Sequence, residues 1–169
     1  VYDQKESLGL TTEQLRLLEN TYQDSVRSGD NLDEAKQARL REVNKQLSTL
    51  GISFGNNVLN ENNTFKLFVE KEEDLQGLPE WFKSSAAAEA EAAGQPGKWL
   101  FTLHSASFLP FMQYAANRDL REQMYKGYTN KGNNNDQNDN KQILADIIKL
   151  RLEKANLMGV NTKDIAQTL

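Results

Sequence analysis

The chain has 169 residues, of which 38% are hydrophobic and 26% charged, with a formal net charge of −4 and no cysteine. This length and composition suit one domain with a real core rather than a disordered chain. The acidic balance argues against nucleic-acid binding, because no basic face is evident that could displace counterions from phosphates. The absence of cysteine excludes disulfides and thiolate metal sites. The chain contains no run of about 18 apolar residues, so no membrane span is predicted. Its charged start, VYDQKESLGL, does not predict a signal peptide. We expect a soluble protein of the cytoplasm or the periplasm.

The first 30 residues predict a capped amphipathic helix. Residues 1–8 suit the end of a helix that Gly9 closes. Thr11 and Gln14 have the spacing of a capping box, in which both side chains bond to free backbone N–H groups. Gly29 suits the end of this helix, because glycine accepts the left-handed conformation found there. One buried stripe is predicted from apolar residues at spacings of three and four: Leu15, Leu18, Tyr22 and Val26.

The next helix shows the most regular pattern of the chain. Its start is indicated by Asn31 and Glu34, and its apolar positions recur at steps of 3, 4, 3 and 4 in Leu40, Val43, Leu47, Leu50 and Phe54. This predicts a helix over 33–59. Gly51 and Gly55 lie inside it, and we interpret them as sites of close helix packing or mild weakening. A break or a functional hinge is the alternative.

Two short strands are predicted in the middle of the chain, over 65–70 and 99–103, and they could pair with each other. The acidic residues Glu72, Glu73 and Asp74 come between them. Such a cluster can bind a cation or act as acid and base, but three consecutive acids more often form a solvated helix start or turn. A helix rich in alanine and glutamate begins after Pro79 and ends before Gly97.

Residues 97–128, GKWLFTLHSASFLPFMQYAANRDLREQMYKGY, are the stretch that we expect to organise the core. The strand pattern changes at Ser107 to helical spacing, which predicts a pair of helices. The apolar positions of this pair are Phe108, Phe111, Met112, Leu120, Met124, Tyr125 and Tyr128.

The C-terminal part begins with the asparagine-rich segment 130–142, which predicts a mobile surface loop. A long helix follows over about 140–158, ended by Gly159, and 162–169 suits a last short helix. The long helix turns Ile143, Ile147, Leu150 and Ala155 toward a core, and Leu144, Ile148 and Leu152 widen that face. The fold class is therefore mainly α: an antiparallel helical bundle with a small two-stranded β element, in one helical domain over 1–169.

The residues alone show no active site. The single histidine, His104, follows the second strand, and with no second histidine or cysteine a zinc site of the usual type cannot be assembled. No H-E-x-x-H, phosphate-binding loop or credible catalytic triad occurs. We interpret His104 as a hydrogen-bonded structural or surface residue. Trp81 and Trp99 could line a peptide-binding groove, although aromatic residues at helical spacing are mostly core. No catalytic, cofactor-binding or metal-binding residue is assigned.

Four segments, over 10–29, 65–79, 97–128 and 139–159, together resemble the non-catalytic helical part of the thimet oligopeptidase family of zinc metallopeptidases. The most specific motifs are L-x-G-L-P, then W-x-x-T-L, then R-x-L-R-E-x-x-Y, in that order. Within the family, the bacterial peptidyl-dipeptidase branch is the more similar.

The resemblance implies an internal fragment that precedes the catalytic domain of a longer peptidase. That family holds zinc with an H-E-x-x-H helix and a further glutamate, none of which is in this chain, so zinc is expected in the parent enzyme and not here. The implied role is to wall the channel that admits short peptides, with those peptides and the catalytic domain of the same polypeptide as partners, and neither nucleic acid nor membrane. The alternative is a stand-alone helical module that binds a peptide or protein partner.

Overall fold

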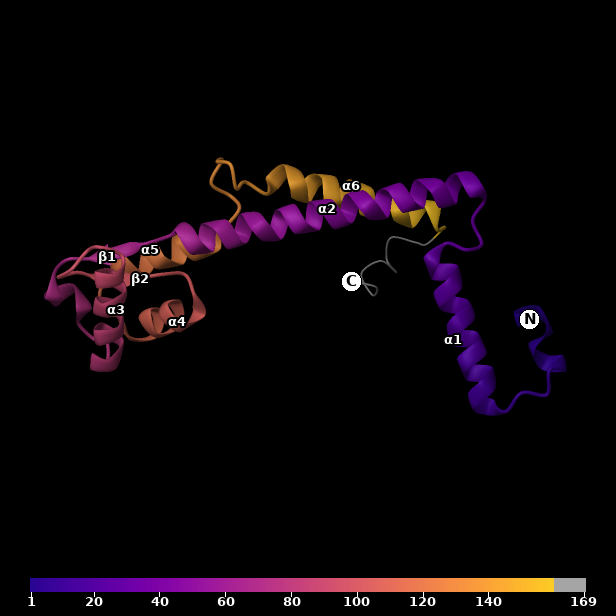
Figure 1. Cartoon of the computed structure of the whole chain (residues 1–169), viewed down its shortest axis with the longest axis horizontal. Coiled ribbons are helices and arrows are strands. Elements are labelled where there is room, and N and C mark those ends of the chain that lie inside the picture. The colour runs from indigo at the N-terminus through magenta and orange to yellow at the C-terminus, as the bar shows by residue number, and fades with distance from the viewer. Residues whose placement is uncertain (160–169) are drawn as a thin grey trace. The chain divides into compact units, whose positions relative to one another are not determined.

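The computed structural model describes residues 1–159 of the chain, so the short helix predicted over 162–169 lies outside the described residues. Figure 1 shows a mainly helical chain with one small sheet. In chain order the elements are η1 (Tyr2–Ser7), α1 (Thr12–Ser28), α2 (Glu34–Thr64), β1 (Leu67–Val69), η2 (Glu72–Leu75), α3 (Glu80–Ala92), β2 (Trp99–Phe101), α4 (Ser105–Tyr114), α5 (Arg118–Thr129) and α6 (Lys141–Leu157). No helix among the described residues is long and apolar enough to cross a membrane.

The chain divides into two compact units. Unit 1 contains Val1–Gly51 together with the chain from Ala145 onward, and unit 2 contains Ile52–Leu144. The long helices α2 and α6 each contribute residues to both units. The two units are described separately below.

In unit 1, the capping box at the start of α1 is confirmed. The Thr11 hydroxyl accepts from the Gln14 backbone N–H at 3.4 Å, and the Gln14 side chain accepts from the Thr11 N–H at 3.0 Å. Gly29 ends the helix with a φ of 91°. Its left-handed conformation is the one that glycine adopts without steric penalty, which explains the helix end predicted there.

The segment before α1 is a 3₁₀ helix, η1, that packs against α1, whose predicted buried stripe is only half-buried. The Tyr2 ring stacks on the Tyr22 ring at a centroid distance of 3.6 Å, and the Lys5 ammonium lies 2.6 Å from a Glu19 carboxylate oxygen. The Glu19 hydrogen bond is the main cause that raises the pKa of Lys5. Residues 1–8 are therefore helical as predicted, but they fold back onto the next helix.

Helix α2 is longer than predicted: it continues five residues past Leu59, to Thr64. Asp33 caps its start, with its side chain accepting from the Lys36 N–H at 2.8 Å. Neither Gly51 nor Gly55 interrupts the helix. A Cβ atom at either glycine would meet nothing within 4 Å, so close helix packing does not explain them.

Helix α6 runs antiparallel to α2 within unit 1. The Arg39 guanidinium donates two hydrogen bonds to the Glu153 carboxylate, at 2.5 and 2.8 Å, while Thr49 and Leu50 line a groove together with Asp146. Early residues of α2 thus lie against late residues of α6.

The predicted apolar face of α6 is correct only in part. Ala155 is buried and the isoleucines at 143 and 147 are half-buried, as is Leu150. The residues expected to widen that face are instead exposed: Leu144, Ile148 and Leu152. That part of the prediction is wrong, because periodicity gives the width of an apolar face but not what covers it.

In unit 2, the two predicted strands pair as an antiparallel sheet. Leu67 lies opposite Phe101, and Val69 lies opposite Trp99. Both strands have three residues and are shorter than the predicted ranges 65–70 and 99–103. The mainly α class with a two-stranded β element is confirmed.

The hydrophobic core of unit 2 lies around this sheet, between it and α3, α4 and α5 (Figure 1). Phe101 is at its centre, with its ring 5.3 Å from that of Phe82 and 4.6 Å from that of Phe111. The buried members are Leu67, Val69, Leu75, Leu78, Phe82, Ala86, Phe101, Leu103, Phe111, Ala115 and Met124. The stretch 97–128 is a core element as predicted, and residues 67–86 supply the rest. Tyr125 and Tyr128, which the helical spacing also assigned to the core, are 56% and 42% exposed.

Candidate functional site

His104 is a structural surface residue, as the sequence predicts. It is the residue before α4, it is exposed, and its Nδ1 atom lies 3.0 Å from the Asn62 side-chain nitrogen at the end of α2. An amide nitrogen is only a donor, so Asn62 donates to Nδ1. The contact ties the end of α2 to the start of α4.

The acidic residues 72–74 form a 3₁₀ turn, η2, which confirms the interpretation as a helix start or turn. Asp74 accepts from the Asn117 side-chain amide at 2.8 Å, and that amide belongs to the N-cap of α5. Glu72 and Glu73 are exposed. Across residues 1–159, no group of three or more histidine, cysteine, aspartate or glutamate side chains is placed to hold a metal ion.

The two tryptophans play different parts. Trp81 is 62% exposed on α3, whereas Trp99 is half-buried and packs against the core of unit 2. Another aromatic pair forms instead, with Phe108 stacked on Tyr128 at 4.2 Å and the Lys131 ammonium 3.8 Å from the centre of the Tyr128 ring. The predicted groove with both tryptophans does not correspond to either pocket described below.

The asparagine-rich segment 130–142 is folded, which corrects the prediction of a mobile surface loop. Its Lys141 ammonium donates to the Asn133 and Asn135 side-chain oxygens at 3.1 and 2.8 Å, and to Asp139 at 2.6 Å. The Lys141 hydrogen bond is the main cause that lowers the pKa of Asp139. A cation that belongs to the chain thus occupies the centre of this loop.

Amide side chains also hold this segment against α2. The Asn140 side chain donates to the Phe54 carbonyl at 3.1 Å and accepts from Asn57 at 2.9 Å. Asn138 accepts from Asn60 at 3.4 Å. Asn138 and Asn140 are both buried. Polar residues here replace the apolar contacts that usually fix a loop, which is why composition gave the wrong prediction.

Glu61 is the residue that sequence reasoning missed. It is 93% buried on α2, since its exposed fraction is 7%. One carboxylate oxygen, Oε2, accepts from the Gly132 backbone N–H at 2.8 Å and from the Asn134 amide at 3.0 Å. The other oxygen, Oε1, is buried with no hydrogen-bond partner among the described residues. Its neighbours in the sequence are asparagines, so only the tertiary fold distinguishes it from a solvated helix end.

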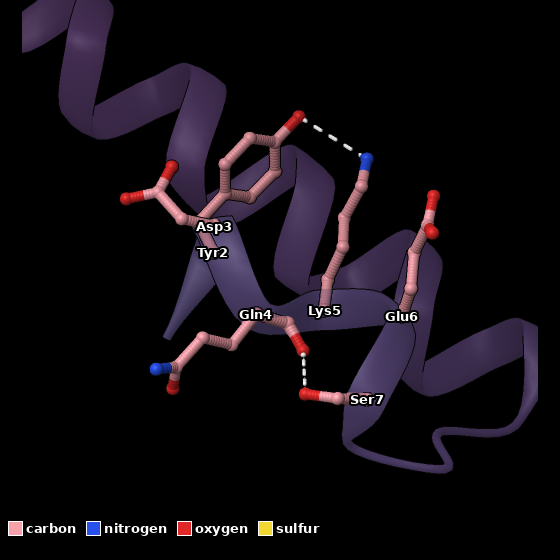
Figure 2. A pocket seen from close by; sticks show the side chains of 6 residues that line it. All are labelled: Tyr2, Asp3, Gln4, Lys5, Glu6 and Ser7. Carbon is pink, nitrogen blue, oxygen red and sulfur yellow. Dashed lines mark hydrogen bonds between the residues drawn. The ribbon is translucent and has the colours of Figure 1, made fainter.

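Described residues of unit 1 line an open hollow and a groove. The hollow has a volume of about 360 Å³ and is lined by the consecutive side chains of η1. Figure 2 shows these side chains, with Lys5 bonded to the Tyr2 hydroxyl and Ser7 to the Gln4 carbonyl. The groove has a volume of about 460 Å³ and lies between α2 and α6. Its lining is Glu42, Lys45, Gln46, Thr49, Leu50, Asp146, Lys149 and Leu150. Both are open and mixed in charge, and neither gathers groups for acid–base or nucleophilic catalysis.

Comparison with known proteins indicates the family of this chain, which the side-chain geometry alone does not. Residues 111–167 match the family model described as peptidase family M3. Oligopeptidase A of Haemophilus influenzae is 39% identical over 88% of this chain and 22% of its own length. The organellar oligopeptidase A of Arabidopsis thaliana is 35% identical over 86% of this chain and 19% of its own.

A dipeptidyl carboxypeptidase of Escherichia coli is 31% identical over 94% of this chain and 23% of its own length. Sequence identity is thus higher to oligopeptidase A than to this dipeptidyl carboxypeptidase. The motifs had indicated the opposite, a closer similarity to the peptidyl-dipeptidase branch. The chain spans about a fifth of the length of these relatives.

Proposed function

Because the chain belongs to the thimet oligopeptidase family, peptidase family M3, we propose that it is a non-catalytic, substrate-channel part of a zinc-dependent oligopeptidase or peptidyl-dipeptidase. The parent enzyme hydrolyses short peptides. In this proposal residues 1–169 form a helical domain that precedes the catalytic domain of the same polypeptide.

One observation carries the proposal: the similarity to oligopeptidase A covers 88% of this chain but only 22% of that relative. A match of this kind is expected when a chain corresponds to one part of a larger enzyme. The relatives are named as peptidases, which does not favour a stand-alone binding module.

The described residues do not fit a zinc centre. The lone histidine bonds to Asn62, and the acidic turn around Asp74 is tied to the cap of α5. No catalytic step is therefore assigned to these side chains. Their proposed work is to hold a helical wall in place: the sheet and core of unit 2 fix α3, α4 and α5, and the amide contacts fix the segment before α6.

A chimera tests the proposal. The matching segment of Haemophilus influenzae oligopeptidase A is replaced by residues 1–169, and hydrolysis of short peptides is compared with the parent and with a version lacking the segment. We expect the chimera to keep kcat/KM within about tenfold of the parent, a loss of roughly 1.4 kcal/mol in transition-state stabilisation. A channel wall also predicts that the chimera cleaves short peptides but not a folded protein. A folded chimera without peptidase activity would contradict the proposal.

A further inference from the structure

Unit 1 buries few apolar side chains of its own. Every member of the main core cluster belongs to unit 2. The buried hydrophobic residues of unit 1 among those described are only Leu40, Val43 and Ala155. Helix pairs are stabilised in water mainly by packing their apolar faces, so unit 1 has apolar surface to cover.

A regular apolar feature, here called the α6 stripe, runs along helix α6 and is made of Leu144, the last residue of unit 2, and Ile148 and Leu152 of unit 1. Their exposed fractions are 48%, 59% and 48%. Spaced four residues apart, they lie one above another on one face of the helix. Single exposed hydrophobic residues are common on proteins. A row of them along one helix face is a candidate contact surface.

The α6 stripe points away from α2. Glu153 bonds to Arg39 on α2, and Leu150 lines the groove with α2. At 100° per residue, Leu150 and Glu153 lie roughly 160° and 140° around the helix from Ile148. Among the described residues, the contact with α2 therefore does not cover the stripe.

We infer that the α6 stripe is a docking face for an apolar surface of the remaining part of the peptidase polypeptide. The inference rests on the proposed function and names the surface through which this part joins the rest. All of α6 lies inside residues 111–167, the segment that matches the M3 family model. The relatives continue for about four-fifths of their length outside the match, so the family fold around α6 extends beyond this chain.

A second copy of the chain is the less favoured occupant. A stable dimer buries about 1,200 Å² or more in total. Each of the three half-exposed aliphatic side chains can bury roughly 100 Å² or less. A pair of stripes would therefore bury only a few hundred Å² in total. A large partner that also covers neighbouring surface fits the stripe better.

Cysteine labelling tests the inference, because the chain contains no cysteine. Two variants are made, Ile148→Cys on the α6 stripe and Lys149→Cys as the matched control on the next residue, whose side chain is 75% exposed. Each is placed in isolated 1–169 and in the full-length chimera with oligopeptidase A. Labelling by a water-soluble maleimide is followed by mass spectrometry of the peptide that contains the new thiol, so thiols of the host do not interfere.

The measured quantity is the ratio of the labelling rate at position 148 to that at position 149. We expect this ratio to fall by about tenfold or more from the isolated chain to the chimera, because a thiol in a packed apolar contact is inert. An unchanged or higher ratio overturns the inference. The ratio could instead fall in isolated 1–169 as the protein concentration rises, with no further fall in the chimera. That result would mean that a second copy covers the stripe, and it would also overturn the inference.

The outcomes separate this inference from the proposed function. If the stripe is protected in a chimera that has no peptidase activity, the docking face is supported and the proposed channel role is contradicted. If the chimera is active but the stripe stays reactive, the channel role is supported and the docking face is contradicted. If the first chimera does not fold, the same two variants are made in a second chimera, in which residues 1–169 replace the matching segment of Escherichia coli dipeptidyl carboxypeptidase. The similarity to that enzyme covers 94% of this chain.

Discussion

At the scale of single residues, buried polar side chains do work that usually falls to hydrophobic ones. Glu61, Asn138 and Asn140 are all buried, and together they join the segment 130–142 to α2. Each of these contacts replaces water with a protein partner, so the segment is ordered without apolar residues. The Oε1 atom of Glu61, which has no hydrogen-bond partner within residues 1–159, shows that the match is not complete.

Replacing Glu61 with alanine tests this arrangement. The change leaves the buried Gly132 N–H without its acceptor, which costs about 1–3 kcal/mol of stability. We expect faster hydrogen exchange at the Gly132 amide and a lower urea midpoint. Glu122→Ala on the exposed face of α5 is the control and should change neither. Unchanged exchange at Gly132 in Glu61→Ala would show that this hydrogen bond does not hold the loop.

Gly77 offers a second test at this scale. Its φ is +88°, and a Cβ atom there would clash with the Tyr114 backbone carbonyl at the end of α4. Gly97 has a similar φ of +82° with nothing within 4 Å of the added atom. Gly97→Ala should cost about 1–2 kcal/mol for the left-handed conformation alone, and Gly77→Ala roughly 1–3 kcal/mol more for the clash. Thermal unfolding compares the two, and equal losses would rule out the contact with Tyr114.

At the scale of elements, the long helices carry features that packing does not explain. Gly51 and Gly55 are exposed inside α2 with no neighbour near their missing Cβ atoms. Their effect is therefore on helix propensity rather than on close approach, which keeps the interpretation of mild weakening and removes that of helix packing.

Alanine at these glycines should stabilise the chain. Gly51→Ala and Gly55→Ala are each expected to raise the free energy of unfolding by about 0.5–1 kcal/mol, because alanine loses less backbone freedom in a helix. Urea denaturation measures the change in the isolated chain. If α2 must bend at these positions for catalysis, the double variant in the oligopeptidase A chimera would lose activity while gaining stability. Unaltered activity would exclude the hinge.

The ion pair between α2 and α6 predicts a pH dependence. The Arg39 hydrogen bond holds the pKa of Glu153 below its ordinary value. A carboxyl with a lowered folded-state pKa contributes stability above its unfolded pKa of about 4.3, and this contribution is lost as pH falls through the lower folded value. Wild type should therefore lose more stability than Glu153→Gln between neutral pH and about pH 3. Parallel pH curves for the two proteins would show that the pair contributes nothing, as is common for exposed ion pairs.

At the scale of the whole molecule, the chain is two compact units, and within residues 1–159 the extended hydrophobic core lies in unit 2. It matches a small part of each relative. In the proposed channel role the chain positions substrate and supplies no catalytic group, so that role predicts no chemistry from the chain by itself.

The isolated chain is therefore expected to be inactive. Purified 1–169 should neither cleave short peptides nor bind zinc tightly, because the described residues contain no suitable ligand group. Fluorogenic peptide assays with and without added zinc, and zinc titration by calorimetry, provide the measurement, with oligopeptidase A as the positive control. Peptidase activity that requires zinc and is abolished by a chelator would disprove the prediction.

The sequence by itself determined the local features. The capping box at Thr11 and the end of α1 at Gly29 follow from interactions between near neighbours, and each of the two short strands follows from alternation along its own residues. The family was also readable, because the spaced motifs from Leu75 to Tyr125 are specific in order and spacing. These features depend on few residues and survive without knowledge of the rest of the fold.

Only the tertiary structure decided which polar and apolar side chains are covered. Glu61 and Asn140 are buried although their composition predicted solvent, and Ile148 is exposed although its spacing predicted a core. The physical reason is that burial depends on what lies opposite a side chain, often more than 70 residues away, as between Glu61 and Gly132. Helical periodicity identifies a face, but the partner of that face is set by the fold and, for the α6 stripe, by a surface that we place outside this chain.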